Sequence, residues 1–309
     1  MATDVHQHIW TPGFAAALRD RDTPPFLDGW TLHLDGEQPY ETDPRDHDVE
    51  RRRALDADLD LALVSLSSPL GIEHLPPHEA WPLLDAYHDG ALELPAPFGA
   101  WAGTCVTEID PTRTAAALDR GFAGLQLPAT SVGDAEGLER AAPLLDLLEK
   151  RDLPLFVHPG PARTPGAPAW WAAVVPYVQQ MHAAWYAFQA FGRPRHPRLR
   201  VCFALLAGLA PLHTERFIAR GGSTRGVVDP GVFLETSSYG HQAIDAITRV
   251  TGIEVVVLGS DRPYASPAKT LLGAAAEQQM RCTNPARLLG ATGTPATTSA
   301  LSNEGAEPR

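Results

Sequence analysis

The stretch Thr3-Asp4-Val5-His6-Gln7-His8-Ile9-Trp10 opens the chain and predicts a short strand. Side chains alternate between the two faces of a strand, so His6 and His8 point to the same side. Two adjacent imidazoles are half of the ligand set that a divalent metal needs. The alternative, a tag remnant or polar residues in a frayed terminus, is disfavoured because the pair lies inside an apolar strand.

Seven more apolar runs follow, and segments with helical period lie between them. The expected strands are residues 61–66, 97–101, 121–128, 153–158, 199–204, 232–237 and 253–258, and the expected helices are residues 46–60, 76–90, 111–120, 135–151, 170–191, 210–220, 241–250 and 284–289. This alternation predicts an α/β fold, a (β/α)8 TIM barrel in a single domain. A doubly wound open sheet is the alternative, which the absence of a glycine-rich phosphate loop disfavours.

Two stretches fall outside this pattern. Residues 11–44 are rich in Pro, Asp and Gly and are too long for an ordinary connection, so we expect a lid or a loop insertion near a site. Residues 291–309 have the composition of a flexible C-terminal tail, which leaves residues 1–290 for the barrel. In the helix expected at 46–60, Leu55 and Leu59 are predicted core residues.

Composition narrows the function classes. The 309 residues suit one barrel, and a hydrophobic content of 44% suffices for its core. A formal net charge of −12 disfavours nucleic acid and anionic membranes as partners. The three cysteines, Cys105, Cys202 and Cys282, form no C-x-x-C pair and indicate reduced thiols in the cytoplasm. We find no signal peptide and no apolar window of about 18 residues.

Four side chains capable of binding metal fall where strands end. In a parallel barrel the chemistry lies at the C-terminal ends of the strands. His6 and His8 close the first strand, His158 closes the fifth, and Asp261 follows the eighth. Each residue alone has an ordinary explanation, such as a hydrogen-bonded histidine or a helix N-cap. Together they predict a divalent metal site with an open position for water or substrate.

Three motifs carry a resemblance to a known family. Asp4–His8, Phe156-Val157-His158-Pro159 and Leu258-Gly259-Ser260-Asp261-Arg262-Pro263 resemble motifs of the amidohydrolase superfamily. The branch they are most similar to is the amidohydrolase-related group that includes aminocarboxymuconate-semialdehyde decarboxylase and related aromatic-acid decarboxylases.

The resemblance implies one metal ion, usually Zn²⁺, with Mn²⁺ or Fe²⁺ as alternatives. His6, His8 and His158 would be its ligands, and Asp261 a ligand or proton carrier. Gln126 stands where binuclear relatives carry a lysine, which favours a single ion. Relatives are often dimers, so a homodimer is expected.

One position departs from the family pattern. Leu205 stands near the end of the sixth strand, where the family places a histidine, and a leucine can neither transfer a proton nor polarise a carbonyl. Three explanations stay open: His182 or His241 replaces it, the metal and Asp261 suffice, or the standard chemistry is lost.

Three residues are candidates for contacts with a small-molecule substrate. Trp101 and Trp170 could line an apolar or aromatic pocket, with Trp171 beside them. Arg262 could bind a carboxylate with both guanidinium nitrogens. Packing of the tryptophans and a salt bridge of the arginine are the alternatives.

Hydrolysis is the leading reaction that we expect. A bound metal lowers the pKa of its water to about 7, and Asp261 would accept the proton during attack on a small amide, ester or lactone. The first alternative is metal-dependent, non-oxidative decarboxylation of an unsaturated or aromatic carboxylic acid. The second is a catalytically silent barrel with a binding role.

Overall fold

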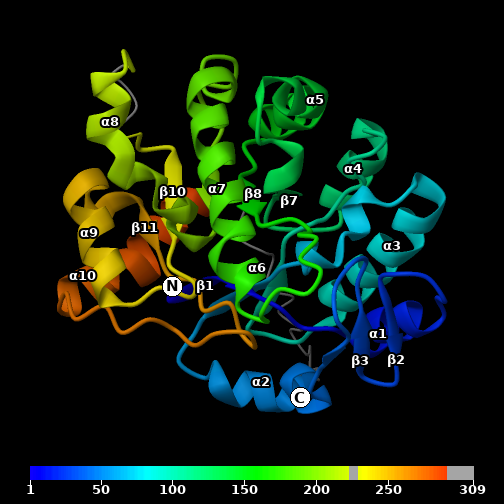
Figure 1. The fold of residues 1–309 in the computed structure, drawn as a ribbon. Coiled ribbons are helices and arrows are strands. Elements are labelled where there is room, and N and C mark those ends of the chain that lie inside the picture. The colour runs from blue at the N-terminus through cyan, green and yellow to red at the C-terminus, as the bar shows by residue number, and fades with distance from the viewer. Residues whose placement is uncertain (223–228, 291–309) are drawn as a thin grey trace, which may run out of the picture.

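A computed structural model describes residues 1–222 and 229–290, and the tail expected at 291–309 lies outside them. Within the described residues eight parallel strands form the centre of the molecule, and helices surround them (Figure 1). The barrel strands are β1 (Thr3–Gln7), β5 (Leu61–Val64), β6 (Phe98–Ala100), β7 (Leu125–Pro128), β8 (Leu155–His158), β9 (Val201–Phe203), β10 (Val232–Glu235) and β11 (Val256–Val257).

Hydrogen bonds at two seams close these strands into a ring. One parallel sheet has the order β1-β5-β6, and the other has the order β11-β10-β9-β8-β7. At one seam the backbone N–H of Ala102 donates to the carbonyl of Gly124 (2.9 Å). At the other, the N–H of Val5 donates to the carbonyl of Leu258 (3.0 Å). The predicted (β/α)8 barrel is therefore confirmed.

The helices cover the outside of the barrel with their apolar faces. In α5 (Ala135–Arg151), Leu138, Leu145 and Leu148 are buried, as the helical period predicts, and the Asp134 side chain caps the first turn. The other helices are α1 (Pro12–Arg19), α2 (Val49–Leu55), α3 (Pro77–Glu93), α4 (Pro111–Leu118), α6 (Trp171–Val174), α7 (Pro176–Ala187), α8 (Thr214–Ala219), α9 (His241–Thr251), α10 (Ala274–Gln278) and α11 (Asn284–Leu289). No described helix is both long and apolar enough to cross a membrane.

The stretch 11–44 is more ordered than its composition suggested. It contains α1, with Pro12 in its first turn, and a small antiparallel sheet of β2 (Phe26–Asp28), β3 (Thr31–His33) and β4 (Tyr40–Glu41). Proline is compatible with a helix start because it lacks only an N–H that has no partner there.

The prediction of core residues in the segment 46–60 is partly wrong. The side chain of Leu55 is 48% exposed at the end of α2, whereas Arg52 is only 1% exposed. The Arg52 guanidinium donates to the carbonyl of His8 (2.6 Å) and to Oε1 of Gln7. These acceptors explain why an arginine rather than a leucine faces the barrel from this helix.

The predicted bounds of the helix at 210–220 are also partly wrong, since α8 begins only at Thr214. Before it, residues 205–209 all have positive φ, between 47° and 60°, and only Gly208 among them is a glycine. A left-handed conformation costs roughly 1–2 kcal/mol for each non-glycine residue. The end of β9 therefore leads into a strained left-handed turn, which a sequence rich in Leu and Ala does not predict.

Candidate metal centre

Four side chains converge at the C-terminal ends of the barrel strands. His6 lies on β1, His8 directly follows it, His158 ends β8, and Asp261 lies in the loop after β11. Their nearest ligand atoms all lie within 4.8 Å of one another. The three imidazoles are buried, and the Asp261 side chain is 15% exposed. The ends of sequence-distant strands thus form one compact cluster, as the sequence predicted.

Each of the three histidines has its Nδ1 atom within hydrogen-bond distance of an oxygen. Because all three partners are carboxylate or carbonyl oxygens, which only accept, each Nδ1 donates and each Nε2 keeps its lone pair. The acceptors are Oε2 of Glu235 for His6 (3.0 Å), the carbonyl of Ser65 for His8 (3.0 Å) and the carbonyl of Pro159 for His158 (2.9 Å).

The Nε2 atoms of His6 and His8 face one another. His6 Nε2 and His8 Nε2 are 3.0 Å apart, and Oδ1 of Asp261 lies 3.6 Å and 3.3 Å from them. Two lone pairs at this distance repel each other, whereas ligands of one tetrahedral zinc ion lie roughly 3–3.5 Å apart. The donor set and its spacing therefore fit a divalent cation at the centre of the cluster.

The pKa directions agree with a ligand role. Burial lowers the pKa of His8 and of His158, and neighbouring imidazoles lower both further, so these rings are neutral. Burial acts in the same direction on His6, but the carboxylate of Glu235 outweighs it and raises the pKa of His6. A more basic imidazole is a better electron donor to a metal.

Asp261 is held as a carboxylate. Burial opposes its ionisation, but the neighbouring imidazoles, with His8 first among them, outweigh burial and lower its pKa to about 2. The Oγ of Ser238 donates to its Oδ2 (3.2 Å), so one carboxylate oxygen faces the imidazoles and the other faces a hydroxyl. Both Ser238 and Asp261 have positive φ, a strained conformation that is common at functional sites.

A buried polar network fixes the strand that carries two of the cluster histidines. Oδ1 of Asp4 accepts hydrogen bonds from the backbone N–H groups of His6 and Ser260, both at 3.1 Å. The Gln7 amide donates to the other Asp4 oxygen (3.0 Å), and the Arg52 guanidinium donates to Oε1 of Gln7. These bonds join β1 to the loop that carries Asp261.

The five remaining predicted site residues lie elsewhere. The ring of His182 contacts His213 at the surface, and His241 is exposed at the first position of α9. Trp101 is fully buried inside the barrel, where its Nε1 donates to the Val5 carbonyl (2.9 Å). Trp170 is exposed before α6, and Arg262 pairs with Asp56.

The two positions that depart from family patterns also have clear surroundings. Phe203, the last residue of β9, pairs with Val157 of β8. Leu205 therefore lies just beyond the end of β9, close to the height at which His158 ends β8. It is buried and offers only an apolar surface there. The Gln126 amide donates to the Leu66 carbonyl (2.8 Å), so it forms a buried hydrogen bond within the protein.

Sequence reasoning missed three residues around the cluster. Glu235 is a buried carboxylate at the end of an apolar strand, an unusual position that could have marked it. The ring of Tyr264 lies 5.4 Å from that of His8. Ser238 gave no signal, because an exposed serine after a strand is common.

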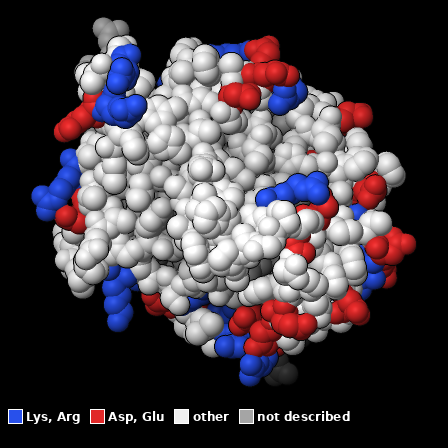
Figure 2. All heavy atoms as spheres, viewed as in Figure 1, with Lys and Arg blue, Asp and Glu red and all other residues white. Residues whose placement is uncertain are grey.

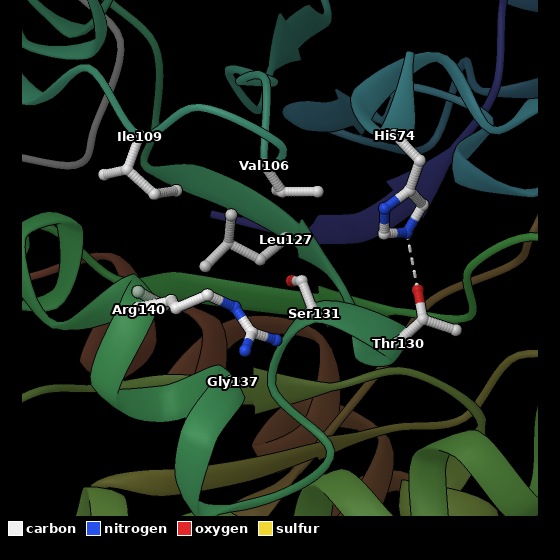
Figure 3. Close-up of a pocket in the computed structure, with 9 residues that line it drawn as sticks. His74, Val106, Ile109, Leu127, Thr130, Ser131, Gly137 and Arg140 are labelled. Atoms are coloured by element: carbon white, nitrogen blue, oxygen red, sulfur yellow. Dashed lines mark hydrogen bonds between the residues drawn. The ribbon is translucent and has the colours of Figure 1, made fainter. Parts of the chain in front are cut away.

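A pocket of about 270 Å³ lies beside the barrel, and none of the four cluster residues lines it. Figure 3 shows His74 bonded to Thr130 (2.7 Å), with Arg140 on the opposite side. Arg140 pairs with Glu136 (2.7 Å). Because its polar groups already have partners, this pocket does not compete with the cluster as a reaction site.

Solved structures share this barrel fold. IDCase of Metarhizium anisopliae matches with a TM-score of 0.73 and 14% identity, over 94% of this chain and 97% of that one. The manganese-containing 5-carboxyvanillate decarboxylase of Novosphingobium aromaticivorans matches with a TM-score of 0.69 and 18% identity, over 94% and 96%. The 2,6-dihydroxybenzoate decarboxylase of Rhizobium matches with a TM-score of 0.64 and 17% identity, over 93% and 98%. No family model and no curated protein matches the chain.

At these identities the comparisons establish the fold. They confirm the resemblance to the amidohydrolase-related group, since an amidohydrolase II and several aromatic-acid decarboxylases share the barrel. They also correct the leading expectation from the sequence, which was hydrolysis. The matching structures named for a reaction are mainly decarboxylases, so the alternative expectation, decarboxylation, takes its place.

Proposed function

We propose that this protein is a metal-dependent, non-oxidative decarboxylase of a small aromatic or unsaturated carboxylic acid. The observation that carries the proposal is the arrangement of His6, His8, His158 and Asp261, whose donor atoms face one point at the mouth of the barrel. The decarboxylases with the same fold support the choice of reaction.

In the proposed reaction the bond between the carboxylate and the ring or alkene carbon breaks, carbon dioxide leaves, and the carbon takes up a proton. A divalent ion supplies Lewis-acid stabilisation of the negative charge. We assign to Asp261 the transfer of this proton from solvent to the carbon, after which Asp261 is again a carboxylate. Its Oδ1 faces the imidazoles, and its Oδ2 accepts from Ser238, which connects it to the exposed side of the loop.

The surroundings of the cluster favour an aromatic substrate. Tyr264 lies beside His8, and burial, together with nearby groups that include Tyr264 and Asp261, raises the pKa of Tyr177 on α7. Leu205 adds an apolar surface at the end of β9. Because Arg262 is engaged by Asp56, we assign the substrate carboxylate to the metal rather than to this arginine.

Figure 2 supports an uncharged approach to the mouth. Acidic and basic side chains lie mainly along the rim of this face, whereas its middle, where β1, α6 and α7 lie in Figure 1, is largely uncharged. Trp170 is exposed on this part of the chain and stays a candidate for substrate contact. A flat aromatic acid suits such a surface better than a polyanion.

Zinc and manganese are the metals that we propose. Three imidazoles and one carboxylate suit Zn²⁺. Manganese is favoured by the 5-carboxyvanillate decarboxylase, which contains it. Elemental analysis of the purified, untagged protein should find about one equivalent of metal per chain.

The test of function is a release assay for carbon dioxide on the metal-loaded protein. Substrates would include 2,6-dihydroxybenzoate, 5-carboxyvanillate and unsaturated acids, with esters and lactones beside them. We expect carbon dioxide from at least one acid, and a loss of about 100-fold or more in kcat for Asp261→Asn with metal still bound. Arg249→Gln, on the outer face of α9, is the control. Metal-replete protein that releases no carbon dioxide but cleaves an ester or lactone contradicts the proposal.

We also propose that the protein is cytoplasmic and forms a homodimer. Cys105, Cys202 and Cys282 are free thiols, which supports a reducing compartment such as the cytoplasm. Exposed Trp170, Trp171 and Val174 would suit a homodimer contact. Sedimentation analysis of the purified chain would test it.

A further inference from the structure

A cluster of basic and aromatic side chains lies away from the metal centre, in an open cleft between α7 and α8. The cleft measures about 370 Å³ and is lined by His182, Tyr186, His213, Arg216, Phe217 and Arg220. None of the four metal-site residues lines it, and the proposed reaction uses none of these six.

The aromatic part of the cleft is preorganised. The ring of Tyr186 lies 5.5 Å from that of Phe217 and 5.1 Å from that of His182. The Tyr186 hydroxyl donates to the Ala210 carbonyl (3.1 Å), which fixes the ring in place. The cleft therefore offers aromatic surface that does not have to be ordered when a ligand binds.

The two arginines of the cleft lack a carboxylate partner among the residues that the structure describes. Arg216 and Arg220 are four positions apart, one helical turn, so both guanidinium groups reach the same side of α8. Among residues 1–222 and 229–290, neither arginine has an ion pair, and no carboxylate lines the cleft. Glu215 belongs to the same helix but does not line the cleft.

Elsewhere this acidic protein pairs its arginines. Most described arginines contact a carboxylate, including Arg113 with Asp85, Arg151 with Asp119 and Arg249 with Asp245. In a chain with a net charge of −12, Arg216 and Arg220 are two of the few described arginines without a carboxylate partner; others of that kind, such as Arg19 and Arg287, donate to backbone carbonyls. Figure 2 shows basic side chains over α8 at the upper left of the molecule.

We propose that this cleft binds a small aromatic anion, with the ring against Tyr186 and Phe217 and the carboxylate or phosphate on Arg216 and Arg220. Guanidinium groups bind both anions through paired hydrogen bonds, and they stack on flat rings. The volume suits one ring system with its anionic group. An aromatic carboxylic acid and a mononucleotide are the two sources of such a ligand.

Calorimetric titration of the metal-loaded protein tests the proposal. The probes are benzoate, phenyl phosphate, adenosine monophosphate and inorganic phosphate. We expect phenyl phosphate to bind at least about tenfold more tightly than inorganic phosphate, and the relative affinity of benzoate and the nucleotide to identify the source. Phe217→Leu keeps an apolar side chain but removes the ring, so it should abolish the preference for phenyl phosphate.

Two variants separate this cleft from the metal centre. The double variant Arg216→Gln/Arg220→Gln should lose at least about tenfold in phenyl phosphate affinity, whereas Arg45→Gln/Arg249→Gln, which removes the same charge from two exposed ion pairs, should keep it. His158→Ala should also keep it. The ring signals of His182 and His213 in NMR spectra should shift on binding.

Three results would overturn the proposal. They are unchanged affinity in the Arg216→Gln/Arg220→Gln variant, equal affinity for inorganic and phenyl phosphate, and no binding of any probe at millimolar concentration. Each result can occur while the decarboxylase is active, so failure here is distinguishable from failure of the proposed function.

Discussion

His6 and His8 face each other through their Nε2 atoms at 3.0 Å, while Glu235 and the Ser65 carbonyl hold their Nδ1 atoms from behind. The acceptors fix the tautomers, and the tautomers direct two lone pairs at one point. Two neutral imidazoles in these tautomers repel each other at this distance, and either a metal ion or a proton on His6 relieves that repulsion. The predictions below start from this relationship.

Removal of His158 should abolish tight metal binding. The His158→Ala variant loses one of the three imidazoles, and we expect a fall in metal affinity of well over tenfold. The measurement is metal content by elemental analysis after dialysis against a weak chelator. His182→Ala is the matched control, because its ring lies in the cleft at α8 and should leave metal content unchanged. A full equivalent of metal in His158→Ala, with unchanged affinity, would refute the ligand assignment.

Glu235 should act on the metal through His6. Glu235→Gln keeps the size of the side chain and an acceptor for Nδ1 but removes the charge that raises the pKa of His6. We expect metal affinity to fall about 10- to 100-fold, the usual effect of losing such an outer carboxylate. Competition with a chromophoric chelator measures it. Circular dichroism should show the fold unchanged, and equal affinity of variant and parent would rule out this role.

Stability should fall as pH rises because of Glu73. Burial raises the pKa of this carboxyl from its ordinary 4.5 to about 7. The folded protein therefore holds a proton that the unfolded chain releases, so the stabilisation is complete below about 4.5 and is lost as pH approaches 7. The shift corresponds to about 3 kcal/mol.

Chemical denaturation between pH 5 and 8 measures this slope. In Glu73→Gln the side chain is neutral throughout and retains an acceptor for the Ser68 hydroxyl. This variant should lose the part of the pH dependence that comes from Glu73. Identical slopes for variant and parent would contradict the assignment.

Gly208 should tolerate no side chain. It has a φ of 60°, and a Cβ atom built there clashes with the Val178 carbonyl oxygen on α7. We expect Gly208→Ala to lower the free energy of unfolding by about 2 kcal/mol or more, from strain and displacement of the helix. Gly13→Ala, which meets nothing within 4 Å, should be neutral or slightly stabilising in the same thermal melts.

The sequence was sufficient for the barrel and for the four cluster residues, and the physical reason is periodicity. Apolar strands end at definite residues, and parallel strands bring their ends to one face, so His6, His158 and Asp261 could be placed together without coordinates. Glu235 escaped notice because its partner, His6, is distant in sequence and only closure of the ring brings them together.

Other features had no local signal. Arg52 is buried because backbone and amide acceptors from β1 happen to meet it, which no helical pattern reports. The left-handed turn at 205–209 contradicts the preferences of Leu and Ala, so tertiary packing must impose it. His182 and His241 were reasonable replacements for a missing histidine, but their positions on α7 and α9 depend on how those helices pack.

The seam between β1 and the end of β11 has a consequence for the order of synthesis. His6 and His8 are synthesised well before Asp261 and before the Leu258 carbonyl that receives the Val5 N–H. A nascent chain therefore carries these two imidazoles before Glu235 and Asp261 have been made. The four donor groups can meet only once Asp261 has been made, so a ribosome-stalled fragment that ends before residue 261 cannot form the complete cluster.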